Sequence, residues 1–216
     1  MKKIILLISL GANLTALSQQ WDWAKEIGPG FDPQFSPLIR TNEAGELFTA
    51  TTGQLPGTGG TYIKVSRYSS SGIPAWEKTI GGELNSGNYV RDLSLDKDNN
   101  LYFLGYCTGS VSFNGASNEF EPGKWQIYLA SFDESGKERW VHYFSFGSSS
   151  SNYLANDAEN NVIIAFADQD HGSWTILKLD PRGELLWEKK FTSSASISRL
   201  RCDGQGNLFL AGELYN

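Results

Sequence analysis

The chain has 216 residues, with 18 basic and 24 acidic side chains and a net charge of −6 at neutral pH. This is long enough for one domain with a substantial hydrophobic core. No segment concentrates lysine and arginine, which argues against a nucleic-acid partner or an anionic membrane surface, because both are bound through clustered positive charge.

The first twenty residues, "MKKIILLISLGANLTALSQQ", have the pattern of a secretory signal. Two lysines precede an apolar run at residues 4–10, and small residues follow at Ala16 and Ser18. The apolar run is far shorter than the roughly 20 residues that span a bilayer. We therefore expect cleavage after Ser18 (signal 1–18), no membrane insertion of the mature chain, and export to the cell surface, the medium or the periplasm.

Two phrases recur in the remaining chain, 19–216. The first comprises "TNEAGELFTATTG", "LDKDNNLYFLGYCTG", "NDAENNVIIAFAD" and "CDGQGNLFLAGEL"; the second comprises "RYSSSGIPAWEKTI", "FDESGKERWVHYF" and "LDPRGELLWEKKF". They alternate in a fixed order, and self-similarity at periods of about 40 to 60 residues is typical of propellers and related arrays.

The second unit shows how each repeat is organised. It contains four apolar segments, at 89–95, 101–107, 125–132 and 138–144, separated by turns rich in Asp, Asn and Gly. A four-stranded unit of this size cannot bury both faces alone, so it has to stack on its neighbours. We therefore predict an all-β fold, a β-propeller of four-stranded blades with about four units.

The predicted units are a closing strand and four blades, the last of them incomplete, at about 21–35, 36–82, 88–147, 151–194 and 196–216. Because the last unit stops after its second strand, the chain is expected to be a partial propeller from a longer repeat protein. An irregular four-bladed ring, in which Trp23 completes the fourth unit, is the alternative.

A tryptophan follows each turn glycine at the fourth position. The pairs are Gly72 and Trp76, Gly136 and Trp140, and Gly183 and Trp187. Recurrence at one phase favours packing against the next blade over a ligand platform. Cys107 and Cys202 lie at different phases of the repeat, so we expect two free, buried thiols.

The second unit, "DKDNNLYFLGYCTGSVSFNG…IYLASFDESGKERWVHYF", resembles the SBBP-type β-propeller repeats of exported bacterial proteins. The likeness extends over residues 21–216, with Lys64 and Lys178 as the third-strand lysines. Asn42 and Glu46 depart from the pattern in the first unit, and Ser131 departs in the second. The resemblance implies a surface or secreted protein of Bacteroidetes-like bacteria. More distantly, the Gly-to-Trp phrase is similar to quinoprotein-like (PQQ-type) propeller repeats.

Four motifs could carry chemistry, and each has a simpler interpretation. Gly105–Gly109, "GYCTG", has the shape of a hydrolase elbow but lies at the end of a predicted strand. His142 and His171 are the only histidines and would need chance convergence. The alternating acidic and amide side chains after Asp96 and Asp157 suit hairpin turns better than a calcium loop. "GTGG" at 57–60 lacks the lysine of a phosphate loop.

Trp125 and Trp174 fall outside the repeated phase, beside long loops. They are weak candidates for stacking on a sugar or gripping a peptide, although packing is the simpler role. No catalytic residue, metal ligand or cofactor is predicted. We expect a non-enzymatic binding or structural module whose partner is a protein or a glycan. The alternative is an enzymatic propeller, quinoprotein-like or glycan-acting, whose catalytic residues lie largely outside this chain.

Overall fold

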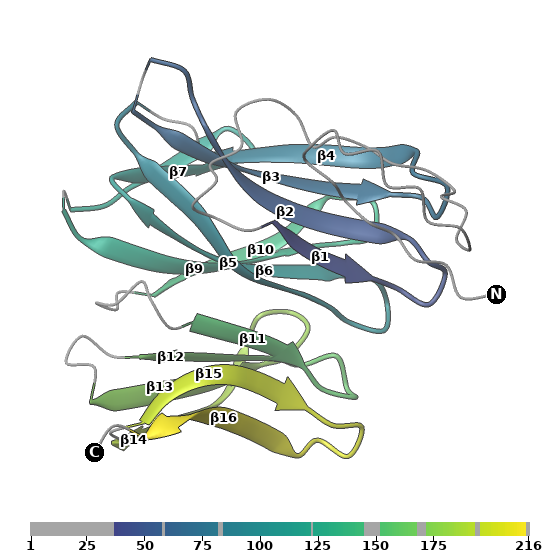
Figure 1. Cartoon of the computed structure of the whole chain (residues 1–216), viewed down its shortest axis with the longest axis vertical. Coiled ribbons are helices and arrows are strands. Elements are labelled where there is room, and N and C mark those ends of the chain that lie inside the picture. Colours follow the sequence, from purple (N-terminus) through teal and green to yellow (C-terminus); the bar gives the residue numbers. More distant parts are fainter. Residues whose placement is uncertain are drawn as a thin grey trace, which may run out of the picture.

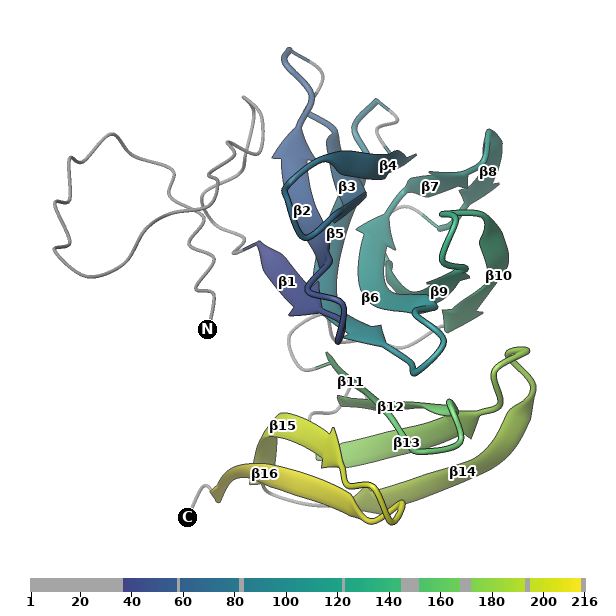
Figure 2. The ribbon, with the colours of Figure 1, turned by 90° about the vertical axis from the view of Figure 1, so that its right-hand side faces the viewer.

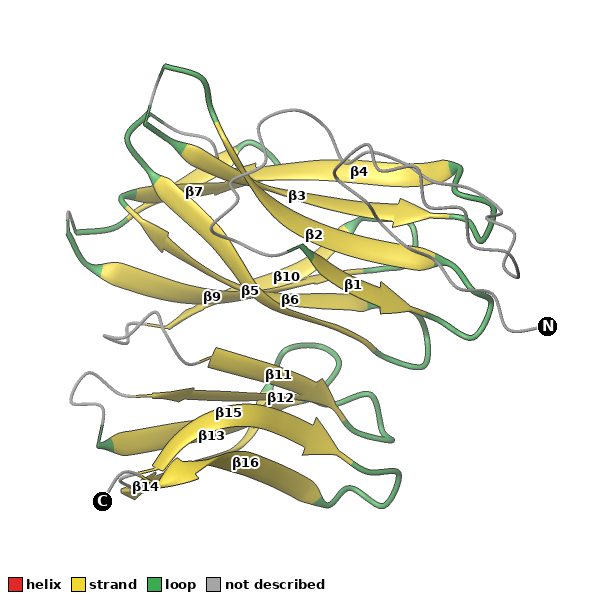
Figure 3. Cartoon of the chain, viewed as in Figure 1, coloured by secondary structure: helices red, strands yellow, loops and turns green. Residues whose placement is uncertain are grey.

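The computed structural model describes residues 37–57, 59–81, 84–121, 123–144, 152–167, 172–192 and 195–214. The predicted signal, the closing strand at 21–35 and His171 lie outside these residues. All sixteen described elements are β-strands and none is a helix, which confirms the predicted all-β class (Figure 3). Within the described segments, no helix is long and apolar enough to cross a membrane.

Three antiparallel four-stranded sheets follow one another along the chain (Figure 1). The first has the strand order β1-β2-β3-β4. Its strands are β1 (Leu38–Thr41), β2 (Leu47–Gln54), β3 (Thr61–Tyr68) and β4 (Pro74–Gly81). The second has the order β5-β6-β9-β10, and its strands are β5 (Gly87–Leu95), β6 (Leu101–Thr108), β9 (Trp125–Phe132) and β10 (Glu138–Phe144).

The third sheet repeats the pattern, and a strand pair follows it. The third sheet contains β11 (Asn152–Asn156), β12 (Val162–Ala167), β13 (Ser173–Leu179) and β14 (Leu185–Thr192). The pair is β15 (Ala195–Cys202) with β16 (Leu208–Leu214). In each sheet, strands adjacent in sequence are adjacent in space, apart from a hairpin inserted in the second.

That inserted hairpin lies where the sequence analysis expected only a loop. Strands β7 (Ser110–Phe113) and β8 (Ala116–Glu119) pair across an Asn114–Gly115 turn. Both turn residues have positive φ, 49° and 82°, as an Asn-Gly hairpin turn requires. The long loop expected before Trp125 therefore contains two paired strands in its middle.

The sheets stack face to face (Figure 2), so β6 and β12, the second strands of the second and third sheets, are buried on both sides. In β6, Leu101 and Phe103 pack toward the first sheet, whereas Tyr102 and Leu104 pack toward the third. Burial on two faces explains the near-continuous apolar runs "LYFLGYC" and "VIIAFA", where a half-buried strand would alternate. A further cluster joins the third sheet to β15–β16 around Leu200.

The first strands of the successive units lie side by side. β5 contacts β1 and β11, and β11 contacts β15. The fourth strands, β4, β10 and β14, lie at the opposite edges of their sheets and are the most exposed. This arrangement places the side chains of four first strands around one shared space.

Candidate functional site

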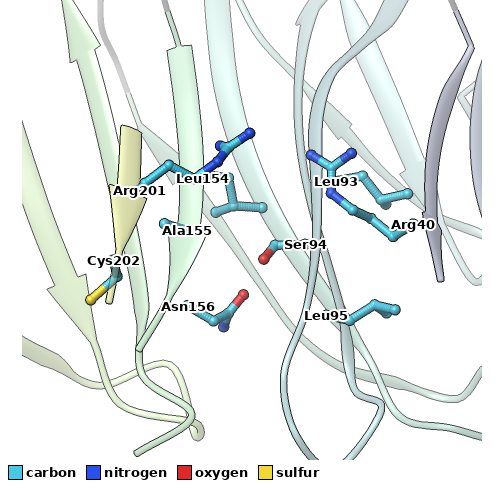
Figure 4. Close-up of a pocket in the computed structure, with 9 residues that line it drawn as sticks. All are labelled: Arg40, Leu93, Ser94, Leu95, Leu154, Ala155, Asn156, Arg201 and Cys202. Carbon is cyan, nitrogen blue, oxygen red and sulfur yellow. The ribbon is translucent and has the colours of Figure 1, made fainter. Parts of the chain in front are cut away.

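A cavity of about 250 Å³ lies between the first strands, and we call it the axial cavity (Figure 4). Residues of β1 and β5 form one wall and residues of β11 and β15 form the other. The two walls are lined by Arg40, Leu93, Ser94, Leu95, Leu154, Ala155, Asn156, Arg201 and Cys202. All four units of the chain therefore contribute residues to its lining.

Asp92 ties three first strands together beside this cavity. Its Oδ1 accepts hydrogen bonds from Arg40 Nη2 and from the Leu93 N–H, both at 2.8 Å. Its Oδ2 accepts from the Leu154 N–H at 3.0 Å. A register shift in β5 between Val90 and Asp92 sets the direction of this side chain.

The charges around Asp92 oppose one another. Burial raises the pKa of the Asp92 carboxyl, and the backbone N–H groups of Leu154 and Leu93 with the positive charges of Arg40 and Arg201 only partly offset that effect. The Asp92 side chain is 13% exposed, whereas that of Arg40 is 36% exposed. One carboxylate therefore faces two guanidinium groups, and the ionised site has an excess of one positive charge.

Arg201 lies across the cavity from Arg40 (Figure 4). Its Nη1 donates to the Leu200 carbonyl at 2.7 Å, and within the described segments it has no carboxylate at ion-pair distance. Asn156 adds an unsatisfied group, because its Oδ1 is buried and accepts no hydrogen bond in the described structure. The cavity thus offers cationic donors and, at Asn156, a buried acceptor without a partner among the described residues.

Two of the recurring tryptophans, Trp76 in the first sheet and Trp140 in the second, pack against the next sheet along the chain. This confirms the packing interpretation for both. Trp76 Nε1 donates to the Glu134 carbonyl at 2.9 Å, and Gly136 lies against the Trp76 ring. Trp140 Nε1 donates to the Pro181 carbonyl at 3.1 Å, and Gly183 lies against the Trp140 ring.

Arginine reinforces both of these contacts. Arg67 Nη1 donates to the Glu134 carbonyl at 2.6 Å, and Arg139 Nη2 donates to the Pro181 carbonyl at 2.7 Å. At each of the two contacts, one turn carbonyl therefore accepts hydrogen bonds from both an indole and a guanidinium group. We call this arrangement the tryptophan–turn junction.

The turns between first and second strands close by one recurring set of bonds. Asp157 Oδ1 accepts from the N–H groups of Glu159 and Asn161, and Asn161 Nδ2 donates to Asp157 Oδ2. Asp96 and Asp203 bond in the same way. The carboxylate oxygens are thus used by the turn itself, which favours the hairpin interpretation over a calcium loop. No group of three metal-binding side chains occurs among the residues described.

The first unit keeps this closure with its polarity reversed. Asn42 Oδ1 accepts from the Glu46 N–H at 3.0 Å, and Asn42 Nδ2 donates to Glu46 Oε2 at 2.7 Å. The departure from the repeat pattern at these two positions is therefore a matched exchange of amide and carboxylate.

Lys64 lies in β3 and Lys178 in β13, so both are third-strand lysines as expected, but they occupy different register positions in their sheets. Lys178 pairs with Trp187 across its sheet, and the residue that pairs with Trp76 is Arg67. Arg67 Nη2 binds Glu46 at 2.8 Å, as Lys178 Nζ binds Asp157 at 2.6 Å. Lys64 instead pairs with Glu77. At the register position that Lys178 holds in the third sheet, the first sheet therefore carries an arginine, Arg67.

Neighbouring turns also contact one another at this end of the sheets. Asn42 Nδ2 donates to Asn99 Oδ1 at 3.0 Å, and Asn160 Nδ2 donates to Asp98 Oδ2 at 2.8 Å. Asn99 and Asn160 both have positive φ, 61° and 65°. A second cavity of about 650 Å³ opens beside the first pair of turns, next to Asn42 and Lys97.

The two candidate ligand-stacking tryptophans differ in exposure. Trp174 is 2% exposed and stacks on Tyr153 at 6.5 Å between ring centroids. Trp125 is half-buried and packs on Tyr106 at 4.8 Å and Tyr89 at 6.2 Å. This geometry favours packing for Trp174, and neither ring lines the axial cavity.

The other motifs lie apart from the cavity. Cys107 is buried in β6, no helix follows it in the described part of the chain, and Gly105 lies against the ring of Tyr128, so "GYCTG" does not form a hydrolase elbow. His142 lies in β10 beside Trp140. Both cysteines are free thiols; Cys107 is buried as expected, whereas Cys202 is only half-buried.

Sequence analysis missed Arg40, Asp92, Asn156 and Arg201. A signal was present, because Arg40, Ser94, Ala155 and Arg201 each stand two residues before the leading residue of their turn. All four line the axial cavity. The residue type at this position differs between units, so it does not belong to the recurring phrases.

Comparisons with known proteins identify no family. No family model matches the chain, and no curated protein matches it in sequence. A solved structure titled "Streptogramin B lyase structure" is 9% identical, and its alignment covers 81% of this chain and 89% of that chain at a TM-score of 0.24.

Proposed function

We propose that this chain is an exported, non-enzymatic β-propeller module that binds a protein or a glycan, and that it is part of a longer repeat protein of the SBBP type. The observation that carries the proposal is the convergence of four first strands on one axial cavity. Strands in this position line the central channel of a propeller, where side chains from different blades meet. Such a site allows a ligand to be contacted by several repeats at once.

The tryptophan–turn junction supports the repeat-array part of this proposal. It joins the first sheet to the second and the second to the third through the same bonds. Trp187 occupies the equivalent position in β14, yet among the described residues its indole N–H has no acceptor. Leu185 and Leu186 beside it are 55% and 51% exposed. The third sheet therefore presents a surface that suits the strand hairpin of a further unit.

The chemistry of the axial cavity favours binding over catalysis. The carboxylate beside it, Asp92, already accepts three hydrogen bonds, one of them from its ion-pair partner Arg40. General acid or base catalysis needs a group that can reach a substrate proton. Guanidinium groups, by contrast, are suited to recognition, because they remain charged and present several donors in a fixed plane.

A screen of the immobilised chain against neutral and acidic glycans and against surface proteins tests the binding function. We expect saturable binding, with the ligand recovered unchanged by mass spectrometry. Time-dependent conversion of a bound ligand would contradict the non-enzymatic assignment and favour the enzymatic alternative.

The repeat-array part has its own test. A copy of residues 172–192 is appended after residue 216, so that its turn glycine can reach Trp187. We expect a higher melting temperature and a blue shift of tryptophan fluorescence. The matched control carries valine at the appended turn glycine, and equal melting temperatures for the two extended chains would contradict the repeat interface.

A further inference from the structure

We propose that the axial cavity binds a uronic acid, with the sugar carboxylate held between Arg40 and Arg201 and a sugar hydroxyl donating to Asn156. The inference rests on the proposed binding function and names the ligand class for that site. Three independent features of the cavity lead to it: its charge, its unsatisfied acceptor and its size.

The charge favours an anion. Asp92 neutralises one of the two guanidinium groups, and Arg201 on the opposite wall has no carboxylate partner within the described part of the chain. A guanidinium has five N–H donors. The described bonds use one on Arg201 and two on Arg40, so both retain donors. Paired N–H donors in a plane match the two oxygens of a carboxylate.

The acceptor favours a ligand that also carries a hydroxyl or an amide donor. Asn156 Oδ1 is buried at the cavity wall and accepts no hydrogen bond from the described residues. Leaving such a group unpaired is costly, so a donor from the ligand is favoured. A carboxylate cannot supply this donor, whereas a sugar hydroxyl can. Ser94 on the facing wall can accept from or donate to a second hydroxyl.

The volume of the cavity and the occupied backbone N–H of Leu154 favour a single sugar over a peptide strand. At about 250 Å³ the cavity is smaller than the roughly 300 Å³ at which drug-sized sites begin. A peptide added to β11 would need its free backbone groups, but the Leu154 N–H already donates to Asp92. Leu95 and Leu154 instead give apolar surface for the C–H face of a ring.

The test follows the arginine side-chain N–H signals by NMR while sodium D-glucuronate, D-glucose or sodium acetate is added to the chain. We expect glucuronate to shift the signals of Arg40 and Arg201 saturably. Glucose lacks the charge and should bind roughly tenfold more weakly or worse. Equal affinity for glucose and glucuronate would overturn the assignment.

Two variants locate the contacts. Arg201→Gln should weaken glucuronate binding roughly tenfold or more, because a charge-assisted pair is lost. Arg199→Gln is the matched control, since Arg199 Nη1 also donates to the preceding carbonyl, at 2.6 Å, and does not line the cavity. Asn156→Ala should weaken glucuronate binding but leave acetate binding unchanged. An equal effect of the two arginine variants would refute the carboxylate site.

Other outcomes separate this inference from the proposed function. Tighter binding of N-acetylalaninate than of glucuronate would assign the cavity to a peptide carboxyl terminus and reject the sugar. A ligand from the screen that binds Arg201→Gln and Asn156→Ala as well as the unmodified chain would leave the binding function standing and place its site elsewhere. Circular dichroism of both variants verifies that they are folded.

Discussion

Gly183 lies directly against Trp140: a β-carbon built on this glycine would come within 2.9 Å of the ring atom Cδ2 and 2.7 Å of His142 Nε2. Gly183 also has a φ of +89°, where side chains other than glycine are strained. Glycine is therefore favoured at this position for two reasons: its positive φ, and the Trp140 ring of the preceding sheet, which leaves no room for a β-carbon. Gly136 has the same relationship to Trp76.

Gly183→Ala should destabilise the chain by about 2 to 4 kcal/mol, because backbone strain adds to a steric clash. Gly206→Ala is the control, since Gly206 has a φ of +83° but nothing within 4 Å of the position that a β-carbon would take. That variant bears the strain alone, about 1 to 2 kcal/mol. Urea unfolding of both measures the difference, and equal losses would show that the ring contact contributes nothing.

Trp140→Phe should cost more stability than Trp187→Phe. Both substitutions remove the indole N–H and some ring area, but only Trp140 donates to a described carbonyl, that of Pro181. The lost hydrogen bond is worth about 1 kcal/mol. Denaturant midpoints of the two variants give the comparison, and a Trp187 variant that loses as much as the Trp140 variant would contradict it.

Acid should weaken the third sheet through Asp157. Burial acts to raise the pKa of this carboxyl, but hydrogen bonds from Lys178, Asn161 and the turn backbone outweigh it and hold the pKa below its ordinary value of 3.8. A carboxyl whose pKa is lowered by folding stabilises the fold above the unfolded pKa. That contribution is lost as the pH falls below about 3.8 and through the folded pKa.

Asp157→Asn should accordingly flatten the loss of stability between about pH 4 and pH 2. Asp203→Asn is the comparison, because Asp203 has the same turn bonds and no lysine partner in the described structure. Thermal unfolding at a series of pH values measures the effect. An acid limb that is steeper in Asp157→Asn than in the unmodified chain would show that the sign is wrong.

The two thiols should react at different rates with a colorimetric disulfide reagent. Cys107 is fully buried, so it should label only when the chain unfolds. Cys202 is half-buried, and burial together with the nearby charges of Asp157 and Asp203 raises its thiol pKa. We expect slow labelling of one thiol in the native chain, abolished by Cys202→Ser. Native labelling that survives this substitution would contradict the burial of Cys107.

The strand positions of the second unit could be predicted because local chemistry determines them. Asp and Asn close the turns through their own side chains, and the apolar segments between them become strands, as at 125–132 and 138–144. The Asn114–Gly115 hairpin is equally local, because an Asn-Gly pair is a hairpin signal, but the sequence analysis expected only a long loop in this stretch. Register could not be read in this way, because Lys64 and Lys178 both lie in third strands, yet Arg67 is the residue at the register position of Lys178.

The repeat, the β class and the packing role of the recurring tryptophan could be read from the amino-acid sequence, because they depend on residue spacing and turn chemistry within a few tens of residues. The cavity that the four first strands line together could not be predicted in this way. Arg40 and Arg201 are 161 positions apart in the chain, and nothing local relates them. They line one cavity because the stacked sheets bring the same repeat position to the same place, and that depends on how the sheets pack.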